Sequence, residues 1–419
     1  MSGGAREAIV IGAGLSGLAA AVDLAVQGVR VTLFEAATQA GGRCRSYVDP
    51  VLDMEIDNGN HFVVSGNHAV FDYLRRTGGA AHMIGLDAPG PTFHDLRDGV
   101  RWTLRPNPGP LAWWVFDKSR RVAGTRAADY LSLAGLLAPR PGRRIDQVMR
   151  CEGVLWDRLL GPFLLGALNT DPKAASADLA SAVIRRTFAR GGAAYQPRIA
   201  HPTLASAFVD PALALLHLRG ARLIFGERVK TLEFDADHVS AVGGERSTRD
   251  IPVILATPPW IAADLVPGLT APNDFRSIVN AHFKIAPPVG APPMLGVIGG
   301  SAEWVFAFRD RLSVTVSGAD AIVDLNREDL ARRFWADVSA VHGLTCDMPP
   351  WQIVKERRAT FAATPEQNAR RPGTATRWEN LFLAGDWTDT GLPGTIEGSI
   401  QSGQKAAALA LRHLAASGG

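Results

Sequence analysis

The sequence predicts an α/β protein, of the α+β two-domain kind, in which a nucleotide-binding domain carries an inserted substrate domain. Its 419 residues exceed what one ordinary core buries and suit about two domains. A glycine-rich strand–turn–helix pattern stands close to the N-terminus, and a second one stands close to the C-terminus. Because glycine-rich turns let the backbone approach a ligand, we expect both ends to serve one binding site.

The composition indicates a globular protein. Hydrophobic residues make up 47% of the chain, and the formal net charge of +3 is too small an excess to indicate nucleic-acid binding. The three cysteines are scattered and form no C-x-x-C pair, so no zinc knuckle or disulfide framework is expected and a reducing, cytoplasmic compartment is predicted. The uncharged stretch 285–302 contains four prolines, which excludes a membrane helix there.

The first motif begins with a short apolar strand at 8–11 and continues as a G-x-G-x-x-G turn, Gly12-Ala13-Gly14-Leu15-Ser16-Gly17. Gly12 permits the tight turn, Gly14 lets the backbone approach a pyrophosphate, and Gly17 lets helix and strand pack closely. The apolar helix that follows presents free N–H groups and its positive dipole end to the phosphates. The motif therefore predicts dinucleotide binding, either NAD or FAD.

The segment after this helix narrows the cofactor. A second strand, 30–34, ends on Glu35-Ala36, where the carboxylate can accept hydrogen bonds from ribose hydroxyls. Gly41-Gly42-Arg43 follow, and an arginine there can meet phosphates, although a surface salt bridge is the alternative. A G-G-R run after the acidic residue resembles FAD enzymes of the amine oxidase and phytoene desaturase superfamily. The resemblance implies FAD as cofactor and a Rossmann-like FAD-binding domain.

In that superfamily the chain returns to the nucleotide domain at its end. The resemblance implies a last strand at 380–385, with Asp386 near the ribityl–phosphate arm of the flavin and a helix that opens at Thr395-Ile396 and points its N–H groups at the flavin. An N-cap or turn aspartate is the alternative for Asp386. The implied cofactor contacts are Gly12, Gly14, Leu15, Ser16, Gly17, Glu35, Ala36, Gly42, Arg43, Asn60, His61, Val229, Thr257, Gly385, Asp386, Thr395 and Ile396.

The same resemblance implies a discontinuous organisation. The FAD-binding domain is expected at 1–69, 200–265 and 370–419, and the substrate domain at 70–199 and 266–369. Runs at 222–234, 239–242 and 251–259 resemble the middle segment of the nucleotide domain, and the resemblance implies that Val229 meets the adenine through its backbone and that Thr257 lies near the cofactor. As plain sequence, these runs are also typical of any β-meander. Helices are expected at 69–77, 175–188 and 327–342.

Two residues are predicted to be catalytic, Asp57 and His61. Asp53, Glu55 and Asp57 alternate with apolar residues, so they share one strand face, and a solvated edge strand is the alternative for the first two. A turn at Gly59 can press the backbone against the flavin ring. A histidine pKa near neutrality would suit proton delivery by His61, although a hydrogen bond to the flavin or the backbone is an equally open role.

Five blocks narrow the resemblance, namely 57–67, 166–177, 275–283, 355–365 and 385–400. Together they resemble the squalene-associated FAD enzymes of bacterial hopanoid biosynthesis, the hydroxysqualene dehydroxylases. This implies a polyisoprenoid substrate, whose allylic hydroxyl leaves as water and is replaced by a hydride from reduced flavin N5. The glycines at 296–300 have the wrong spacing for a second dinucleotide fingerprint, so the unknown electron donor is expected to be a separate protein or a quinone.

Three other functions stay open from the sequence: a carotenoid or phytoene desaturase, a flavin amine oxidase with Lys284 near the flavin, and a non-catalytic polyisoprenoid carrier. An oily substrate also suggests peripheral contact with the inner face of the cytoplasmic membrane. The stretch 110–116 carries apolar and aromatic residues and is followed by Lys118, Arg120 and Arg121. A buried helix with a charged flank is the alternative for that stretch.

Overall fold

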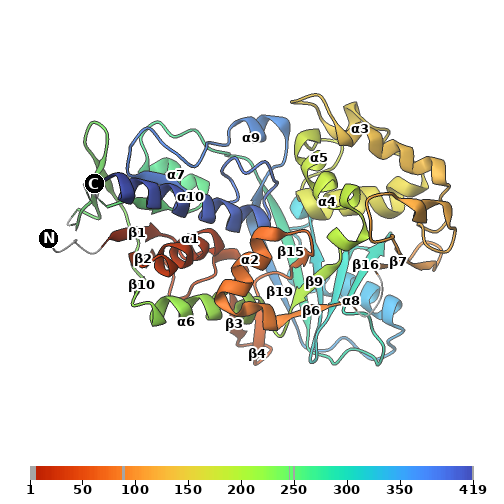
Figure 1. Cartoon of the computed structure of the whole chain (residues 1–419). Coiled ribbons are helices and arrows are strands. Elements are labelled where there is room, and N and C mark those ends of the chain that lie inside the picture. Colours follow the sequence, from red (N-terminus) through yellow and green to blue (C-terminus); the bar gives the residue numbers. More distant parts are fainter. Residues whose placement is uncertain (1–5, 87–89, 245, 249–250, 418–419) are drawn as a thin grey trace.

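The computed structural model describes residues 6–86, 90–244, 246–248 and 251–417. Figure 1 shows two lobes, with the N- and C-terminal ends of the chain together at the outer end of one of them. That lobe contains a five-stranded sheet of order β10-β2-β1-β14-β20, in which all neighbouring strands pair in parallel. Its strands are Arg222–Phe225, Arg30–Glu35, Glu7–Ile11, Val253–Leu255 and Leu381–Leu383.

These strands come from all three stretches that are expected to form the nucleotide domain. The exact boundaries of that domain remain a prediction. The strands are short apolar runs because both faces of the sheet are covered. Ala8 and Val10 pack on one face and Ile9 and Ile11 on the other, as the two-residue period of a strand requires. The first face is covered by α1 (Leu15–Val26), α10 (Ile396–Ser417), α2 (His68–Thr77) and α6 (Asp210–Leu218).

The two helices α1 and α10 lie side by side, although they stand at opposite ends of the sequence (Figure 1). A Cβ placed on Gly403 in α10 would lie 2.1 Å from the carbonyl oxygen of Ser16 in α1. The helices therefore approach at backbone distance, and a glycine is required at this crossing. The other face of the sheet packs against α7 (Pro259–Leu265) and the small sheet β11-β12-β13, whose strands are Leu232–Phe234, Val239–Val242 and Arg246–Ser247.

The second lobe is built on a seven-stranded sheet of order β19-β15-β18-β17-β16-β7-β8. The strands are Trp351–Phe361, Phe275–Phe283, Leu312–Val316, Trp304–Ala307, Met294–Ile298, Thr92–Asp95 and Arg101–Thr103. Neighbouring strands of this sheet pair antiparallel, except for β16 and β7, which pair in parallel. One face packs on α8 (Arg327–His342), whose bounds equal the predicted helix. The other face looks toward the first lobe and the helices α3 (Ala134–Leu137), α4 (Gly161–Leu168) and α5 (Ala177–Arg186).

Smaller elements connect the lobes. The hairpin β3-β4 (Ser46–Asp49 and Met54–Asp57) and the sheet β5-β9-β6 (Phe62–Val64, Pro197–Ala200 and Met83–Gly85) flank the junction, and α9 (Pro365–Ala369) follows β19. The predicted helices at 69–77 and 175–188 are confirmed as α2 and α5, with shifted ends. The predicted strand pair at 222–234 is formed by β10 and β11, but the two strands belong to different sheets.

The stretch 110–116 is not a buried helix. It contains a single 3-10 turn, Trp113–Phe116, in which Trp114 and Val115 are buried. Leu111, Trp113 and Phe116 are 64%, 65% and 70% exposed, and we call these three the aromatic patch. Among the described residues, no helix has both the length and the apolar character that crossing a bilayer requires.

Candidate functional site

The glycine turn after β1 closes tightly at two of its glycines and stays open at the third. Gly12 has φ +105°, and a Cβ there would lie 2.6 Å from the carbonyl oxygen of Ala256. A Cβ on Gly17 would lie 1.8 Å from the carbonyl oxygen of Gly12, whereas a Cβ on Gly14 would meet no atom within 4 Å. Gly14 is also the N-cap of α1 and no side chain caps this helix. The turn therefore leaves helix N–H groups and open space where a phosphate is expected.

Glu35 braces this turn. Its carboxylate accepts hydrogen bonds from the backbone N–H of Ala13 at 2.7 Å and of Ala37 at 2.8 Å. The backbone carbonyl of Glu35 accepts from the N–H of Glu227, which brings the connection between β10 and β11 to the same place. Val229 is buried in that connection. Glu35, the exposed Ala36 and Val229 thus lie around the end of β2, where the ribose and adenine are expected.

Arg43 and Asp386 form a bidentate ion pair. The Nη2–Oδ1 distance is 2.6 Å and the Nη1–Oδ2 distance is 3.0 Å, and Nη1 also donates to the carbonyl oxygen of Ala359. The Asp386 side chain is 6% exposed and the Arg43 side chain 43%, so a buried carboxylate meets a partly exposed guanidinium. Sequence reasoning assigned Arg43 to phosphates and Asp386 to the ribityl arm. In the structure each residue is first of all the partner of the other, because a buried carboxylate needs a counter-ion.

The segment 57–60 lies across the seven-stranded sheet and is held there by side chains of β15. The Nε2 of His282 is 3.0 Å from the carbonyl oxygen of Asp57, and the Nδ2 of Asn280 donates to the carbonyl oxygen of Asn58 at 3.3 Å. A Cβ on Gly59 would lie 3.0 Å from the same Asn280 nitrogen. These polar side chains therefore fix the backbone that is predicted to run beside the flavin ring.

Thr315 and Ser313 of β18 complete this polar ladder. The Thr315 hydroxyl donates to Asn280 Oδ1 at 2.7 Å and lies 3.2 Å from the amide nitrogen of Asn60, while Ser313 Oγ lies 2.9 Å from Nδ1 of His282. With Asp57 O accepting at Nε2 and the Ser313 hydroxyl donating to Nδ1, His282 fits its neutral form. Burial lowers the pKa of His282 to about 3, in agreement with that form. Sequence reasoning missed these residues, although polar Asn280 and His282 at a two-residue spacing in a buried strand were a signal.

Asp57 is buried and its carboxylate is used within the protein. It accepts from the Ser46 hydroxyl at 2.6 Å and from the N–H of Leu204 at 2.8 Å, and Arg311 Nη2 lies 3.5 Å away. Its side chain is 2% exposed, and burial raises the pKa of this carboxyl. These contacts favour a role in holding β4 against its neighbours over proton transfer to a substrate. Glu55, by contrast, is exposed, as expected for a solvated edge.

His61 retains some exposed surface and lies close to Arg43. Burial, reinforced by the charge of Arg43, lowers the pKa of His61 to about 4. This is below the near-neutral pKa that would suit proton delivery, and the imidazole is neutral at pH 7. A neutral imidazole has one donor and one acceptor nitrogen, which suits hydrogen bonding or proton relay but not storage of a proton.

The other end of the site is formed by β20 and the start of α10. Gly385 has φ +153°, and a Cβ there would lie 2.3 Å from the indole nitrogen of Trp387, which donates to the carbonyl oxygen of Thr257 at 2.9 Å. Thr395 caps α10, with its hydroxyl accepting from the N–H of Gly398 at 3.1 Å. Ile396 is buried and begins the helix. Thr257 and Gly385 are thus brought together by one tryptophan.

Glu397, the next residue, faces away from this end. Its carboxylate accepts from the N–H groups of Ala69 and Val70 at 3.2 and 3.0 Å, at the start of α2. Lys284, the lysine of the amine oxidase alternative, donates to the carbonyl oxygen of Leu52 at 2.6 Å. This hydrogen bond ties Lys284 to the β3–β4 hairpin and not to a predicted cofactor residue.

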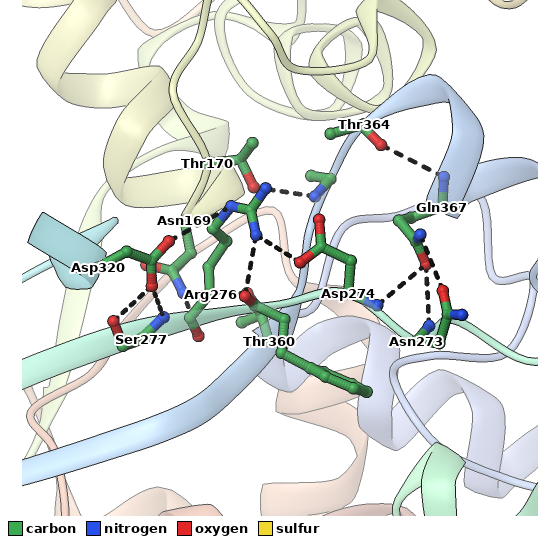
Figure 2. A network of polar contacts seen from close by, with 12 residues as sticks. Asn169, Thr170, Asn273, Asp274, Arg276, Ser277, Asp320, Thr360, Thr364 and Gln367 are labelled. Carbon is green, nitrogen blue, oxygen red and sulfur yellow. Dashed lines mark hydrogen bonds and ion pairs between the residues drawn. The ribbon is translucent and has the colours of Figure 1, made fainter.

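A polar network ties the helices of the second lobe to the Arg43–Asp386 pair. Asn169, in the left-handed conformation at the end of α4, donates to the Thr360 hydroxyl at 3.0 Å and accepts from the N–H of Gly318 at 2.6 Å. Thr360 follows Ala359 directly, the residue whose carbonyl binds Arg43. Figure 2 shows Asn169 and Thr170 above Thr360, with Arg276 reaching toward both Asp274 and Asp320. Sequence reasoning singled out this stretch only as part of a resemblance.

Two buried polar atoms test whether a flavin fits. Asn60 Oδ1 and Thr257 Oγ1 are buried and have no hydrogen-bond partner among the described residues. Both residues are predicted cofactor contacts, and both stand beside the fixed backbone segments described above. The open Gly14, the uncapped α1 and these two atoms fit a dinucleotide cofactor. Phe62, Phe93 and Trp304 form an apolar cluster beside this region, with the ring centroid of Trp304 5.5 Å from that of Phe62 and 5.8 Å from that of Phe93.

Comparison with known proteins agrees with this arrangement. Residues 15–411 match the family model of flavin containing amine oxidoreductases. The chain is 51% identical to a hydroxysqualene dehydroxylase of Rhodopseudomonas palustris, over 96% of this chain and 97% of that protein. It is 48% identical to the hydroxysqualene dehydroxylase of Sinorhizobium fredii, over the same shares of the two chains. The solved structure of cyclohexylamine oxidase from Brevibacterium oxydans is similar with a TM-score of 0.72, at 17% identity over 97% of this chain and 99% of that one, which shows the fold.

Proposed function

Because this chain belongs to the flavin containing amine oxidoreductases, and within them to the hydroxysqualene dehydroxylases, we propose that it reduces hydroxysqualene to squalene with FAD as cofactor. The observation that carries the proposal is the likeness to the Rhodopseudomonas protein, 51% over nearly the whole of both chains. The predicted resemblance is confirmed at this level. The substrate, the direction of the reaction and the mechanism are our proposal.

The reaction exchanges a hydroxyl for a hydrogen. A proton is added to the allylic hydroxyl, the C–O bond breaks, water leaves, and a hydride forms the new C–H bond. Bound FAD, once reduced, supplies this hydride and so the two electrons of the reaction. The protein must hold an apolar chain, exclude water and orient the hydroxyl. The apolar cluster of Phe62, Phe93 and Trp304 beside the fixed segment 57–60 suits these tasks.

We propose that His61 orients the departing hydroxyl and relays to it the proton with which it leaves as water. Its neutral imidazole has both a donor and an acceptor nitrogen, and it stands at the end of the segment that Asn280 and His282 fix. Burial, together with the charge of Arg43 beside it, keeps the imidazole from holding a second proton. Asp57 is proposed to maintain the geometry of this segment through its contacts with Ser46 and Leu204.

We further propose that the electron donor is a separate protein or a quinone and that the enzyme docks peripherally on the cytoplasmic membrane. The aromatic patch supports the second point, because amphipathic aromatic residues favour the membrane interface. A substrate made of isoprene units partitions into lipid, so an enzyme at the bilayer surface meets it at high local concentration.

An anaerobic single turnover tests the function. The purified protein is reduced chemically, hydroxysqualene is added in detergent, flavin absorbance is followed and the product is extracted. Reoxidation of the flavin with stoichiometric squalene is expected. If the reduced protein does not react but the oxidised protein is bleached by squalene or phytoene, the enzyme is a desaturase and the proposal fails.

The His61→Gln variant tests the role of the histidine. It is expected to bind FAD but to reoxidise more slowly, on the order of 10²- to 10⁴-fold for loss of a proton-transfer group. Turnover equal to that of the parent protein would remove His61 from this role. A Glu35→Ala variant serves as contrast, because it should weaken FAD binding and leave little flavin to assay.

A further inference from the structure

A group of cations lines a cavity beside the aromatic patch. The cavity has a volume of about 550 Å³ and is lined by the cations Arg101, Arg105, Lys118 and Arg121, together with the hydroxyls of Thr103 and Ser119. No aspartate or glutamate lines it among the described residues. Four positive charges around one hollow raise the local positive potential, which favours the binding of an anion there.

Two of the cations are held in place by the protein. Arg121 donates to the carbonyl oxygen of Val115 at 3.1 Å, and its Nε is buried without a partner. Arg101 donates to His94 Nδ1 at 3.0 Å and to the carbonyl oxygen of Val341. The nearby acid Asp117 is used by Ser119, whose N–H and hydroxyl lie 2.9 and 2.8 Å from its carboxylate. Asp117 lies close enough to Arg121 for the two charges to interact, but its carboxylate is hydrogen-bonded to Ser119 and does not line the cavity.

The other two cations, Arg105 and Lys118, are exposed, and neither side chain forms a hydrogen bond or an ion pair within the described part of the chain. They are therefore available to an external anion. Guanidinium and ammonium groups around a hollow with hydroxyl donors match the oxygens of a phosphate.

The aromatic patch and the cavity are parts of one surface. Phe116 stands two positions before Lys118, and Arg121 of the cavity binds the carbonyl of Val115, whose neighbours are the buried Trp114 and exposed Phe116. Trp113 and Phe116 pack together, with ring centroids 6.4 Å apart. Exposed aromatic residues next to a basic hollow fit a bilayer, with the rings among the lipid chains and the hollow at the head groups.

We propose that this cavity binds the phosphate of an anionic phospholipid, and that it and the aromatic patch together dock the enzyme on the membrane that carries its substrate. This deepens the proposed function and rests on it for the identity of the substrate. The site makes binding depend on the lipid composition of the membrane, because the cavity requires a negatively charged head group while the aromatic patch does not.

Vesicle flotation tests the proposal with the FAD-loaded full chain. Vesicles of phosphatidylcholine alone are compared with vesicles that also contain phosphatidylglycerol. Binding is expected to be stronger to the anionic vesicles, and the double variant Arg105→Gln/Lys118→Gln is expected to lose about ten- to thirtyfold of that binding. Neither side chain makes a contact that the fold needs. The matched control is Arg219→Gln/Lys405→Gln, which removes the same charges from the C-cap of α6 and from α10 in the other lobe and should bind like the parent (Figure 1).

Equal binding to both kinds of vesicle, or equal loss in the control and the cavity variant, would overturn the lipid site. A Trp113→Ser/Phe116→Ser variant should lose binding to neutral and anionic vesicles alike, and unchanged binding would also overturn the proposal. Single-turnover activity with detergent-dispersed substrate is measured on every variant and should equal that of the parent. The docking site and the proposed reaction can therefore fail independently.

Discussion

Arg43 and Asp386 are joined by two hydrogen bonds, the shorter 2.6 Å, although 343 positions separate them in the sequence. The pair ties the turn that follows β2 to the loop that follows β20, and the Ala359 carbonyl brings in β19 of the second lobe. Two segments that are predicted to meet the flavin and one strand of the second lobe are thus held by one guanidinium.

We expect Asp386→Asn to destabilise the protein by about 1–3 kcal/mol, because Arg43 loses its charged partner in a largely buried place. The value stays below that of a fully buried pair because the Arg43 side chain is 43% exposed. Urea unfolding and the flavin-to-protein absorbance ratio measure the effect. Asp324→Asn is the control, since it breaks an exposed ion pair with Arg357 and should cost less than about 1 kcal/mol. Equal effects of the two changes would contradict a joining role for Asp386.

Gly14→Ala and Gly17→Ala should separate cofactor binding from folding. An alanine at 14 has φ −69° and open space, so the apoprotein should be as stable as the parent or slightly more stable, while FAD binds more weakly. An alanine at 17 clashes with Gly12 O at 1.8 Å and should destabilise even the apoprotein by several kcal/mol. Thermal unfolding of apoprotein and FAD titration measure the two effects. Comparable FAD affinity in Gly14→Ala and the parent would show that no phosphate approaches there.

Asn280→Leu tests whether β15 positions the segment beside the flavin. The change removes the donor to Asn58 O while keeping similar volume, so FAD should still bind. We expect flavin reoxidation by substrate to slow by about 10²-fold, the cost of a small misplacement of reacting groups. Ser277→Ala on the same strand, whose hydroxyl binds Asp320 instead, should keep its rate. The flavin absorbance spectrum provides a second measurement, since a purely structural loss would leave it unchanged in the folded fraction.

Glu303 should make stability fall as pH rises. Burial raises the pKa of this carboxyl to about 7, above its ordinary value of 4.5. Between these values the folded state binds the proton and the unfolded state does not, so this contribution is complete below pH 4.5 and lost as pH rises through 7. Glu303→Gln keeps an acceptor for the N–H of Ser317 and should stabilise the protein at pH 8 by about 2–3 kcal/mol, but not at pH 4.5. Denaturant unfolding at both pH values measures this, and a gain that is independent of pH would refute the assignment.

The local parts of the fold were predictable from the sequence. The turn at Gly12, the helix α1 and the helix α8 depend on glycine spacing and hydrophobic period within one short stretch, and such signals are local. The order of strands in the first sheet was accessible only through the resemblance, because β10, β14 and β20 join from distant segments and no periodicity specifies a partner.

The candidate site was predictable in its parts and not in its contacts. Arg43 and Asp386 were both identified, but their pairing depends on a three-dimensional meeting that neither segment encodes alone. The histidine at 61 was identified too, but its pKa depends on burial and on the charge of Arg43. The roles of Asn280 and His282 were not predicted, because polar residues in a strand also occur for packing reasons. The carbonyl oxygens that these two side chains bind lie on another segment.

The crossing of α1 and α10 at Gly403 affects how the protein folds during its synthesis on the ribosome. At about 5–20 residues per second, tens of seconds pass between synthesis of the first motif and of the helix that covers it. During this time the apolar side of α1 and the edge of β14 wait without their partners. We therefore expect flavin to bind only after the chain is complete, and we expect a product that ends before α10 to be unstable, however intact its first motif.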